Sequence, residues 1–470
     1  MNISSSSYRL VAGLLAIVFG SAGVGVCRGA PPRLKVSPDH RFLVTEKGQP
    51  FFYLGDTAWE LFHRLNEEES RKYLTNRAEK GFTVIQAVVL AELDGLRTPN
   101  ANGDIPLKEN DPTRPVEAYF QHVDRVVDQA AELGLYIGML PTWGDKWISN
   151  QGGDGPVIFN VKNARAYGEF LGKRYRNSPI IWILGGDRSL KKDEHLAIIR
   201  AMAEGLQAGD GGNHLMTFHP RGGENSANLF HQDKWLDFNM VQSGHGQLNT
   251  PNYKFALNNR ALTPVKPTLD GEPRYEDHPV NWRPDQGWFD EWDVRQAAYW
   301  SMLAGACGHT YGDHNIWQMW QPGRRPISSA RTAWQTALDH PGAFQMGHLR
   351  RLFESRPWQL LEPDQELIVG DAGSGAYHVR AARASDGSFA FVYTPMGKPV
   401  TIDLAHLTEH ALTAHWFDPR LGKASSISTI SRAEQQTFTP PSQGRGNDWI
   451  LVLDEQSRQF SAPGSSPLLK

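Results

Sequence analysis

Short apolar runs alternate with longer amphipathic segments along most of the chain, from about residue 51 to residue 317. The apolar runs predict strands at residues 51–56, 82–90, 135–140, 180–184, 215–219, 238–242, 267–270 and 309–317. The longer segments predict helices, clearest at residues 66–80, 116–133, 164–175, 195–207 and 294–306. Eight strand-then-helix steps favour an α/β fold of the (β/α)8 TIM-barrel type over an open doubly wound sheet. The first strand lacks a following glycine-rich dinucleotide loop, which also argues against the open sheet.

The pattern changes near residues 357–364, where short alternating strands and tight turns replace the long amphipathic segments. Strands are expected at residues 376–383, 389–393, 400–404, 413–417 and 448–453. This spacing predicts a small all-β sandwich. We therefore expect a barrel over residues 31–360, a C-terminal β-sandwich over residues 361–456, and a disordered tail rich in Ser and Pro over residues 457–470. Two domains also fit a length of 470 residues, which exceeds what one hydrophobic core usually supports.

The N-terminal segment has the layout of an export signal. Arg9 precedes an apolar run over residues 10–26, and small residues and Pro31-Pro32 follow it. This layout predicts a signal peptide over residues 1–30, and therefore an exported protein, periplasmic or secreted. An uncleaved membrane anchor is the alternative, disfavoured because the run is short and glycine-rich for a spanning helix. Removal of the segment would leave Cys307 as the only cysteine, so no intrachain disulfide is expected.

Composition narrows the classes of ligand. A net charge of −3 gives no basic footprint for nucleic acid. The chain holds 15 Trp and 13 Tyr, rings that can stack on sugars but equally fill cores. No serine or cysteine stands in a nucleophile-elbow setting, which argues against acyl transfer. The histidines lack the local spacing of zinc enzymes, so we expect no metal. No cofactor is expected either, and nothing in the sequence implies a protein partner.

The active face of such a barrel is formed by the carboxyl ends of its strands and by the loops that follow them. Polar and aromatic residues at those ends are therefore the candidates for substrate binding and catalysis. In chain order they are Asp56, Trp59, Glu92, Trp143, Asp145, Asp187, His219, Gln242, His245, Glu272, Tyr275, Glu276, His314 and Trp317.

Two of these acids suit glycoside hydrolysis. Asp187 follows the predicted fourth strand, and Glu272 follows the seventh. Cleavage of a glycosidic bond needs one protonated carboxyl group and one ionised carboxylate, with pKa values that their surroundings push apart. Arg188 beside Asp187, and Arg274 with Tyr275 near Glu272, could supply that difference.

Each candidate also has a structural alternative. Asp187 could cap a helix that starts near Leu190, whereas Glu272, between Gly and Pro, has no capping role. Glu276 could be a supporting acid that orients a neighbour. Trp143 and Trp317 could be stacking platforms or parts of the core.

Three motifs together resemble a known family. They are Phe52-Tyr53-Leu54-Gly55-Asp56-Thr57-Ala58-Trp59, Trp182-Ile183-Leu184-Gly185-Gly186-Asp187 and Leu269-Asp270-Gly271-Glu272-Pro273-Arg274-Tyr275-Glu276. The chain resembles the apiosidase-like proteins of glycoside hydrolase family 140, over about residues 34–454. Those proteins have a (β/α)8 barrel followed by a small β domain named for collagen binding.

The resemblance implies a bacterial, exported enzyme that acts on plant pectin, whose substrate is an oligo- or polysaccharide. Apiosidase activity on rhamnogalacturonan II side chains is the implied reaction, with Asp187 as acid/base and Glu272 as nucleophile of a retaining mechanism. Ten of the other twelve strand-end residues are predicted to bind substrate: Asp56, Trp59, Trp143, His219, Gln242, His245, Tyr275, Glu276, His314 and Trp317. The alternatives are a glycosidase of the same fold for an arabinoside, xyloside or rhamnoside, and a non-catalytic carbohydrate- or matrix-binding protein.

Overall fold

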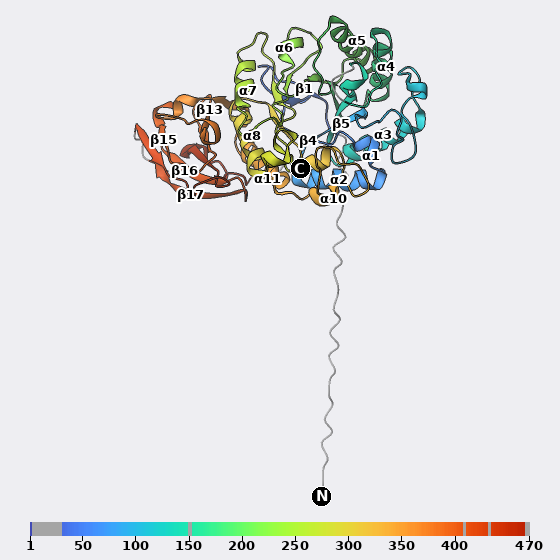
Figure 1. Cartoon of the computed structure of the whole chain (residues 1–470). Helices are drawn as coiled ribbons and strands as arrows, with labels where there is room; N and C mark the ends of the chain where they lie inside the picture. Colours follow the sequence, from blue (N-terminus) through green and yellow to red (C-terminus); the bar gives the residue numbers. More distant parts are fainter. Residues whose placement is uncertain (2–30, 149–152, 408–409, 431–433, 466–470) are drawn as a thin grey trace.

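The computed structural model describes Met1 and residues 31–148, 153–407, 410–430 and 434–465 (Figure 1). The predicted signal peptide falls in residues 2–30, which lie outside the described residues. None of the described helices combines the length and the apolar character needed to cross a membrane.

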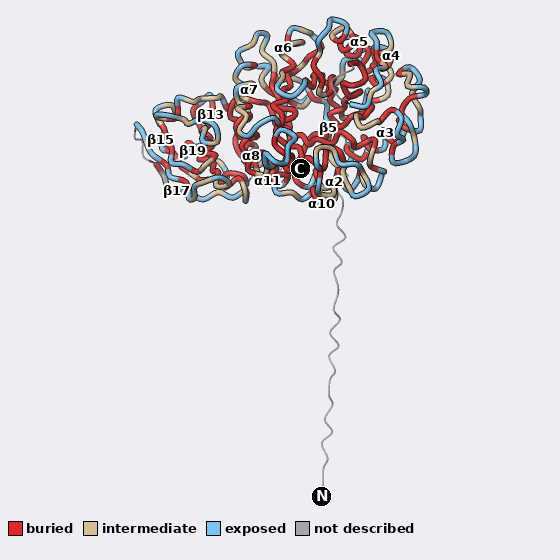
Figure 2. Tube along the Cα trace, in the orientation of Figure 1, coloured by how far each residue is buried: buried red, intermediate tan, exposed pale blue. Residues whose placement is uncertain are grey.

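Eight parallel strands form the barrel, in the spatial order β8-β7-β6-β5-β4-β11-β10-β9. They are β4 (Tyr53–Thr57), β5 (Val84–Leu90), β6 (Tyr136–Thr142), β7 (Ile180–Gly185), β8 (Met216–His219), β9 (Asn239–Val241), β10 (Thr268–Asp270) and β11 (Gly308–Tyr311). Two hydrogen bonds join the end strands β8 and β9. The Asp237 N–H donates to the Met216 carbonyl at 2.9 Å, and Thr217 Oγ1 donates to the Phe238 carbonyl at 2.7 Å. The predicted (β/α)8 class is confirmed, and Figure 2 shows the buried residues gathered along these central strands.

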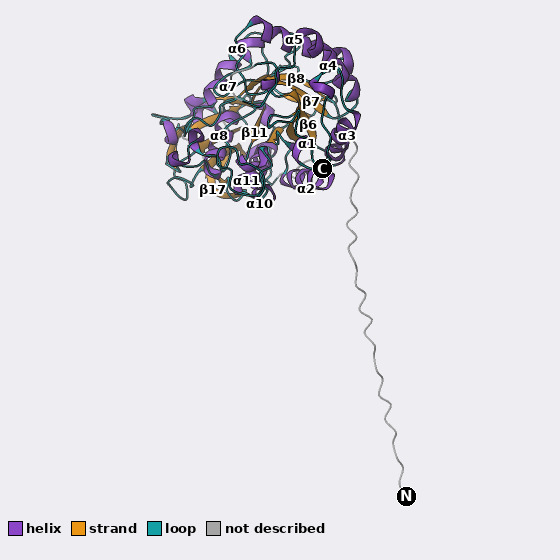
Figure 3. Ribbon diagram, turned by 45° about the vertical axis from the view of Figure 1, so that its right-hand side comes forward, coloured by secondary structure: helices purple, strands orange, loops and turns teal. Residues whose placement is uncertain are grey.

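Helices surround the strands (Figure 3). They are α1 (Leu61–Arg64), α2 (Glu67–Lys80), α3 (Glu117–Glu132), α4 (Val161–Arg174), α5 (Asp193–Asp210), α6 (Ala227–Phe230), α7 (Tyr253–Arg260), α8 (Glu291–Leu303), α9 (His314–Trp317), α10 (Trp334–Ala337) and α11 (Pro341–Glu354). The predicted strand at residues 309–317 is wrong in its second half. The strand β11 ends at Tyr311, and Asp313 then accepts hydrogen bonds from the N–H groups of Asn315 and Ile316, which caps helix α9.

A small antiparallel sheet precedes the barrel, and the hydrophobic pattern did not predict it. Its strands are β1 (Leu34–Val36), β2 (Leu43–Thr45) and β3 (Pro50–Phe51). The Phe51 ring packs edge-on against Tyr136, with 5.1 Å between ring centroids. Since Tyr136 begins strand β6, this sheet covers the amino ends of the barrel strands and leaves the carboxyl ends open.

The C-terminal domain is all-β, as predicted. A six-stranded sheet has the order β12-β13-β14-β19-β16-β17, and β15 pairs with β18. The strands are β12 (Leu361–Pro363), β13 (Arg380–Ala384), β14 (Phe389–Thr394), β15 (Val400–Asp403), β16 (Leu412–Asp418), β17 (Lys423–Ile430), β18 (Gln435–Phe438) and β19 (Trp449–Glu455). Strand β13 begins four residues later than expected because residues 375–377 form a 3-10 turn, and β17 and β18 were not predicted.

The central strand β14 of the six-stranded sheet is buried on both faces. Along β14, Phe389 and Phe391 belong to the core shared with the barrel, whereas Ala390 and Val392 belong to the domain's own core. This alternation has the period of two residues that a strand requires. A strand covered on both faces has few positions left for polar residues, which explains the continuous apolar run.

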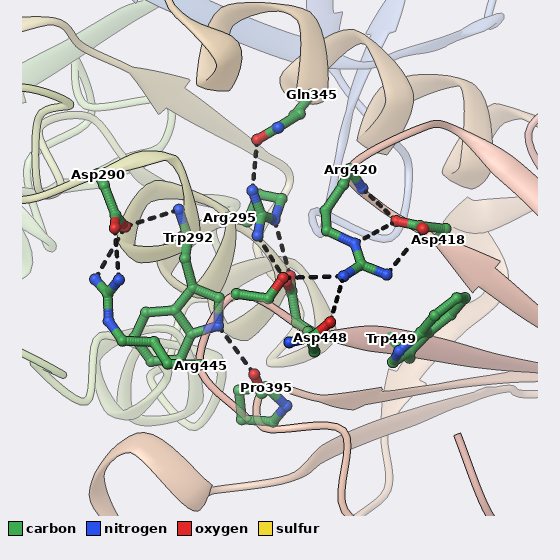
Figure 4. A network of polar contacts seen from close by, with 12 residues as sticks. Asp290, Trp292, Arg295, Gln345, Pro395, Asp418, Arg420, Arg445, Asp448 and Trp449 are labelled. Carbon is green, nitrogen blue, oxygen red and sulfur yellow. Dashed lines mark hydrogen bonds and ion pairs between the residues drawn. The ribbon is translucent and has the colours of Figure 1, made fainter. Parts of the chain in front are cut away.

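Polar contacts also fix the domain to the barrel (Figure 4). Arg295 of α8 forms a buried ion pair with Asp448, at 2.6 and 2.9 Å. The indole N–H of Trp292 donates to the Pro395 carbonyl at 2.9 Å. Because a buried charge without its partner is costly, the junction requires both Arg295 and Asp448.

The expected disordered tail is wrong for residues 457–465. The Phe460 ring packs against Phe389, with 5.9 Å between ring centroids, and Arg356 Nη1 donates to the Ser461 carbonyl at 2.8 Å. These contacts hold the segment against the domain despite its Ser and Pro content. Residues 466–470 lie outside the described residues.

Candidate active site

Glu272 lies at the carboxyl end of β10 with only 7% of its side chain exposed. The Nε2 atom of His245 makes a hydrogen bond of 3.0 Å with Oε1, and the Nε2 atom of His219 lies 2.9 Å from Oε2. Burial raises the pKa of Glu272, but the two histidines outweigh burial and lower the pKa to about 2. Glu272 is therefore a buried carboxylate that stays ionised.

The backbone before Glu272 is held from three sides. The Gly271 N–H donates to the Val241 carbonyl at 2.8 Å, and its carbonyl accepts from Gln86 Nε2 at 2.9 Å. A Cβ atom at Gly271 would lie 2.6 Å from Met240, so a larger residue would push the strands apart. The glycine therefore permits the close approach that places Glu272.

Asp187 follows β7 through two glycines in unusual conformations. Gly185 and Gly186 have φ of +105° and +124°, and Asp187 itself has φ of +49°. A left-handed backbone at a non-glycine residue stores about 1–3 kcal/mol of strain, which is typical of functional positions. Helix α5 begins only at Asp193, with Lys192 as its N-cap residue, so Asp187 does not cap it.

The side chain of Asp187 is 33% exposed and accepts hydrogen bonds from Arg188 Nη1 at 3.1 Å and from the Gly222 N–H at 3.3 Å. Burial of the carboxyl and the negative charge of Glu272 raise its pKa, against the opposing effects of Arg188 and His219. Asp187 is therefore the acid of the pair with the higher pKa.

His219 connects the two acids. The Asp187 N–H donates to Nδ1 of His219 at 3.4 Å, which leaves Nε2 as the ring nitrogen that faces away from Asp187. That Nε2 atom is the one beside Glu272. Trp59 and Trp143 hold the ring in place, with centroids 5.3 and 5.9 Å from the ring of His219.

Both acids line one cavity of about 130 Å³. Its lining residues are Trp59, Glu92, Trp143, Asp187, Gln242, His245, Glu272, Tyr275, His278, Trp282, Trp317 and Ile327. A larger cleft of about 700 Å³ shares Asp187, Gln242, His245 and Trp282 with it. Gln242 Oε1 is buried without a hydrogen-bond partner, so it can accept from a ligand hydroxyl.

Glu92 also enters the site, although its partner is Arg188. Arg188 Nη2 donates to Glu92 Oε1 at 2.9 Å. Burial raises the pKa of Glu92 to about 7, because Asp187 and Asp145 add to the effect of burial and Arg188 offsets only part of it. Arg188 is therefore shared between Glu92 and Asp187.

Four predicted substrate ligands do not line the cavity: Asp56, His219, Glu276 and His314. Asp56 is fully buried and accepts from Tyr73 and from Arg77 Nε, at 2.5 and 2.6 Å. Because side chains alternate along a strand, Asp56 faces helix α2 rather than the barrel interior. Asp56 therefore connects strand β4 to helix α2, and the prediction that it contacts the sugar is wrong.

Glu276 and His314 lie behind the cavity wall. Glu276 accepts from the Tyr311 hydroxyl at 2.6 Å and from the Gly342 N–H at 3.0 Å, at the start of helix α11. His314 Nε2 lies 3.0 Å from the Ser328 carbonyl, and its ring packs against His278. Both residues support the site from outside it.

Sequence reasoning missed His278 and Trp282. Of the two residues that it placed near Glu272, Tyr275 lines the cavity with it, whereas Arg274 is buried and donates to the Asp293 carbonyl and to Gln296 Oε1. Trp282 is 51% exposed, has φ of +58°, and lies in the loop after β10 rather than at a strand end. A search restricted to the strand ends therefore could not find Trp282.

Residues 37–360 match the sequence family described as "Apiosidase-like, catalytic domain", and residues 362–454 match "Putative collagen-binding domain of a collagenase". No curated protein sequence matches the chain. A solved glycoside hydrolase is 34% identical, with 92% of this chain and 98% of that chain covered and a TM-score of 0.84. A solved glycoside hydrolase family 5 protein from Bacteroides vulgatus ATCC 8482 is also 34% identical, with 92% and 95% covered and a TM-score of 0.84. The chain is a glycoside hydrolase and belongs to the apiosidase-like family.

Proposed function

We propose that the chain is a retaining glycoside hydrolase in which Glu272 is the nucleophile and Asp187 the acid/base. The observation that carries this proposal is the contrast between two acids in one cavity. Two histidines keep Glu272 ionised, while burial and the charge of Glu272 raise the pKa of Asp187 and so favour its protonated form. One group of each kind is what the reaction needs.

The proposed reaction has two steps. Glu272 attacks the anomeric carbon as the glycosidic C–O bond breaks, and Asp187 gives its proton to the departing oxygen. Asp187, now ionised, takes a proton from water, and that water attacks the same carbon and releases Glu272. Tyr275 can assist, because burial and the charge of Glu272 raise its pKa and keep the hydroxyl protonated as a donor.

The substrate belongs to the same proposal. We assign the chain to glycoside hydrolase family 140 and its activity to an apiosidase of pectic glycans, with rhamnogalacturonan II side chains as substrate. The family match to apiosidase-like catalytic domains supports this choice. The small cavity is suited to one sugar, and the larger cleft to the rest of the glycan. Export through residues 1–30 would bring the enzyme to such a polymer.

The test is release of sugar from rhamnogalacturonan II by the full chain, beside Glu272→Gln. Free apiose from the unmodified protein alone supports both substrate and nucleophile. Release of arabinose, xylose or rhamnose would keep the mechanism and replace the substrate. Proton NMR of the first-formed anomer tests retention, and an inverted product would overturn the nucleophile assignment.

A further inference from the structure

A groove of about 560 Å³ lies where the barrel meets the C-terminal domain. Leu257 of α7 forms one side, and Glu362, Asp364, Arg380, Arg383 and His406 belong to the other. The cleft beside the active site is lined by Lys254 and Asn258 of the same helix. Helix α7 therefore separates the catalytic cleft from this junction groove.

Arg380 is the unusual residue of the junction groove. It is only 4% exposed, and its Nε atom has no hydrogen-bond partner. Among the described residues its guanidinium has no ion pair, and it lies over the Tyr253 ring with Cζ 5.7 Å from the centroid. Burial lowers the pKa of Arg380 to about 10, so the group remains charged at neutral pH. A buried cation without a counter-charge is costly, and this one is in the wall of a groove.

The acids nearby do not supply that counter-charge. Asp364 Oδ2 accepts from Arg383 Nε at 2.6 Å and lies 3.2 Å from His406 Nδ1. Glu362 pairs with Arg260 at 3.2 Å. Both acids therefore have a partner other than Arg380, and Glu366, the third acid of the groove, forms no ion pair with Arg380 among the described residues.

The same grouping disfavours a metal ion. Asp364, Glu366 and His406 bring possible ligand atoms within 4.8 Å of one another. However, Asp364 is already bound by Arg383, and two arginines line the groove. The buried charge in the groove that lacks an ion pair among the described residues is the Arg380 guanidinium.

We propose that the junction groove is a second carbohydrate-binding site, in which Arg380 holds the carboxylate or sulfate of an anionic sugar. A guanidinium binds oxyanions through paired N–H groups, and the bond is strongest where water is excluded. Its place across α7 from the catalytic cleft suits one long acidic glycan that contacts both. The family assignment contributes only that the ligands are carbohydrates, so the proposal does not depend on which residue attacks the sugar.

Calorimetric titration of the full chain tests the site, with Glu272→Gln present throughout to prevent turnover. The probes are an oligogalacturonate, a sulfated galactan oligosaccharide and a neutral galactan oligosaccharide of equal length. We expect at least one acidic probe to bind, more weakly at high salt, and the neutral probe to bind at least tenfold more weakly. Arg380→Met should weaken the acidic probe about tenfold. Binding of the oligogalacturonate would identify the ligand group as a carboxylate, and binding of the sulfated galactan would identify it as a sulfate. Hydrolysis of a probe by the Glu272→Gln variant would count against the nucleophile assignment and not against this site.

The double variant Arg221→Ala, Lys254→Ala is the matched control, because both residues line the catalytic cleft. Loss of acidic-probe binding in this variant, with full binding in Arg380→Met, would place the anion in the catalytic cleft and overturn the proposal. Equal binding of neutral and acidic probes would overturn it as well. Without ligand, Arg380→Met should keep or raise Tm, since it removes an unpaired buried charge. A fall of several degrees in Tm with unchanged binding would make Arg380 a structural residue.

Discussion

The surroundings of Glu272 and of Asp187 differ in what stands beside each carboxyl group. Glu272 is 7% exposed and faces two imidazoles, whereas Asp187 is 33% exposed and faces a guanidinium. An arginine neighbour would ordinarily give Asp187 the lower pKa of the two. The structure has the opposite order, because burial and the charge of Glu272 outweigh Arg188.

Sharing explains why Arg188 has a limited effect. Its Nη2 donates to Glu92 at 2.9 Å while Nη1 donates to Asp187 at 3.1 Å. Glu272, by contrast, has a histidine beside each of its oxygens. The comparison teaches that burial and the charge of a neighbouring carboxylate can outweigh an adjacent arginine in deciding which acid ionises first.

Removal of the ionised member should have the largest effect. Glu272→Gln keeps the shape of the side chain but cannot attack carbon, so kcat should fall roughly 10⁴-fold or more. Steady-state kinetics on an aryl glycoside measures this, with circular dichroism to confirm folding. In Glu272→Ala, azide should restore turnover and give a glycosyl azide of inverted configuration. A folded Glu272→Gln variant within tenfold of full activity would break the comparison.

Removal of the protonated member should act through the leaving group and through pH. Activity needs ionised Glu272 and protonated Asp187, so kcat/KM should fall as pH rises through the raised pKa of Asp187. Asp187→Asn should abolish that basic limb and lower kcat about 10²- to 10³-fold on alkyl glycosides. Cleavage of dinitrophenyl glycosides, which need no proton, should suffer much less at the first step. Equal losses on both substrates would contradict the acid role.

Replacement of a histidine should move the other limb. His245→Gln removes a partner that lowers the pKa of Glu272, so that pKa should rise from about 2 toward its ordinary value. The acidic limb of kcat/KM should then move to higher pH, with a loss of at most about fourfold near pH 4. His314→Gln is the control, because His314 lies behind the cavity and does not contact Glu272. An unmoved limb in His245→Gln would show that His219, rather than His245, holds the pKa of Glu272 low.

The sequence predicted the barrel and the strand ends that carry Asp187 and Glu272, because both follow from apolar periodicity. It could not predict that His219 and His245 converge on Glu272, since that depends on how far β8 and β9 extend beside β10. Asp56 shows the same limit, because one step along a strand turns a side chain from the cavity to a helix.

Replacement of Trp282 should have the smallest effect of these changes, and it tests which part of the substrate lies beside Asp187. Trp282 lines both the small cavity and the larger cleft, on the more open side that Asp187 also borders. If that side holds the leaving group, Trp282→Ala should raise KM about threefold to tenfold on oligosaccharides, the scale of one aromatic contact. KM on a short alkyl glycoside and kcat on either substrate should change less than twofold, because the ring does not touch the reacting carboxyl groups. An equal rise in KM on both substrates would instead place the ring beside the attacked sugar. The side of the cavity that Trp282 and Asp187 share would then hold that sugar rather than the leaving group.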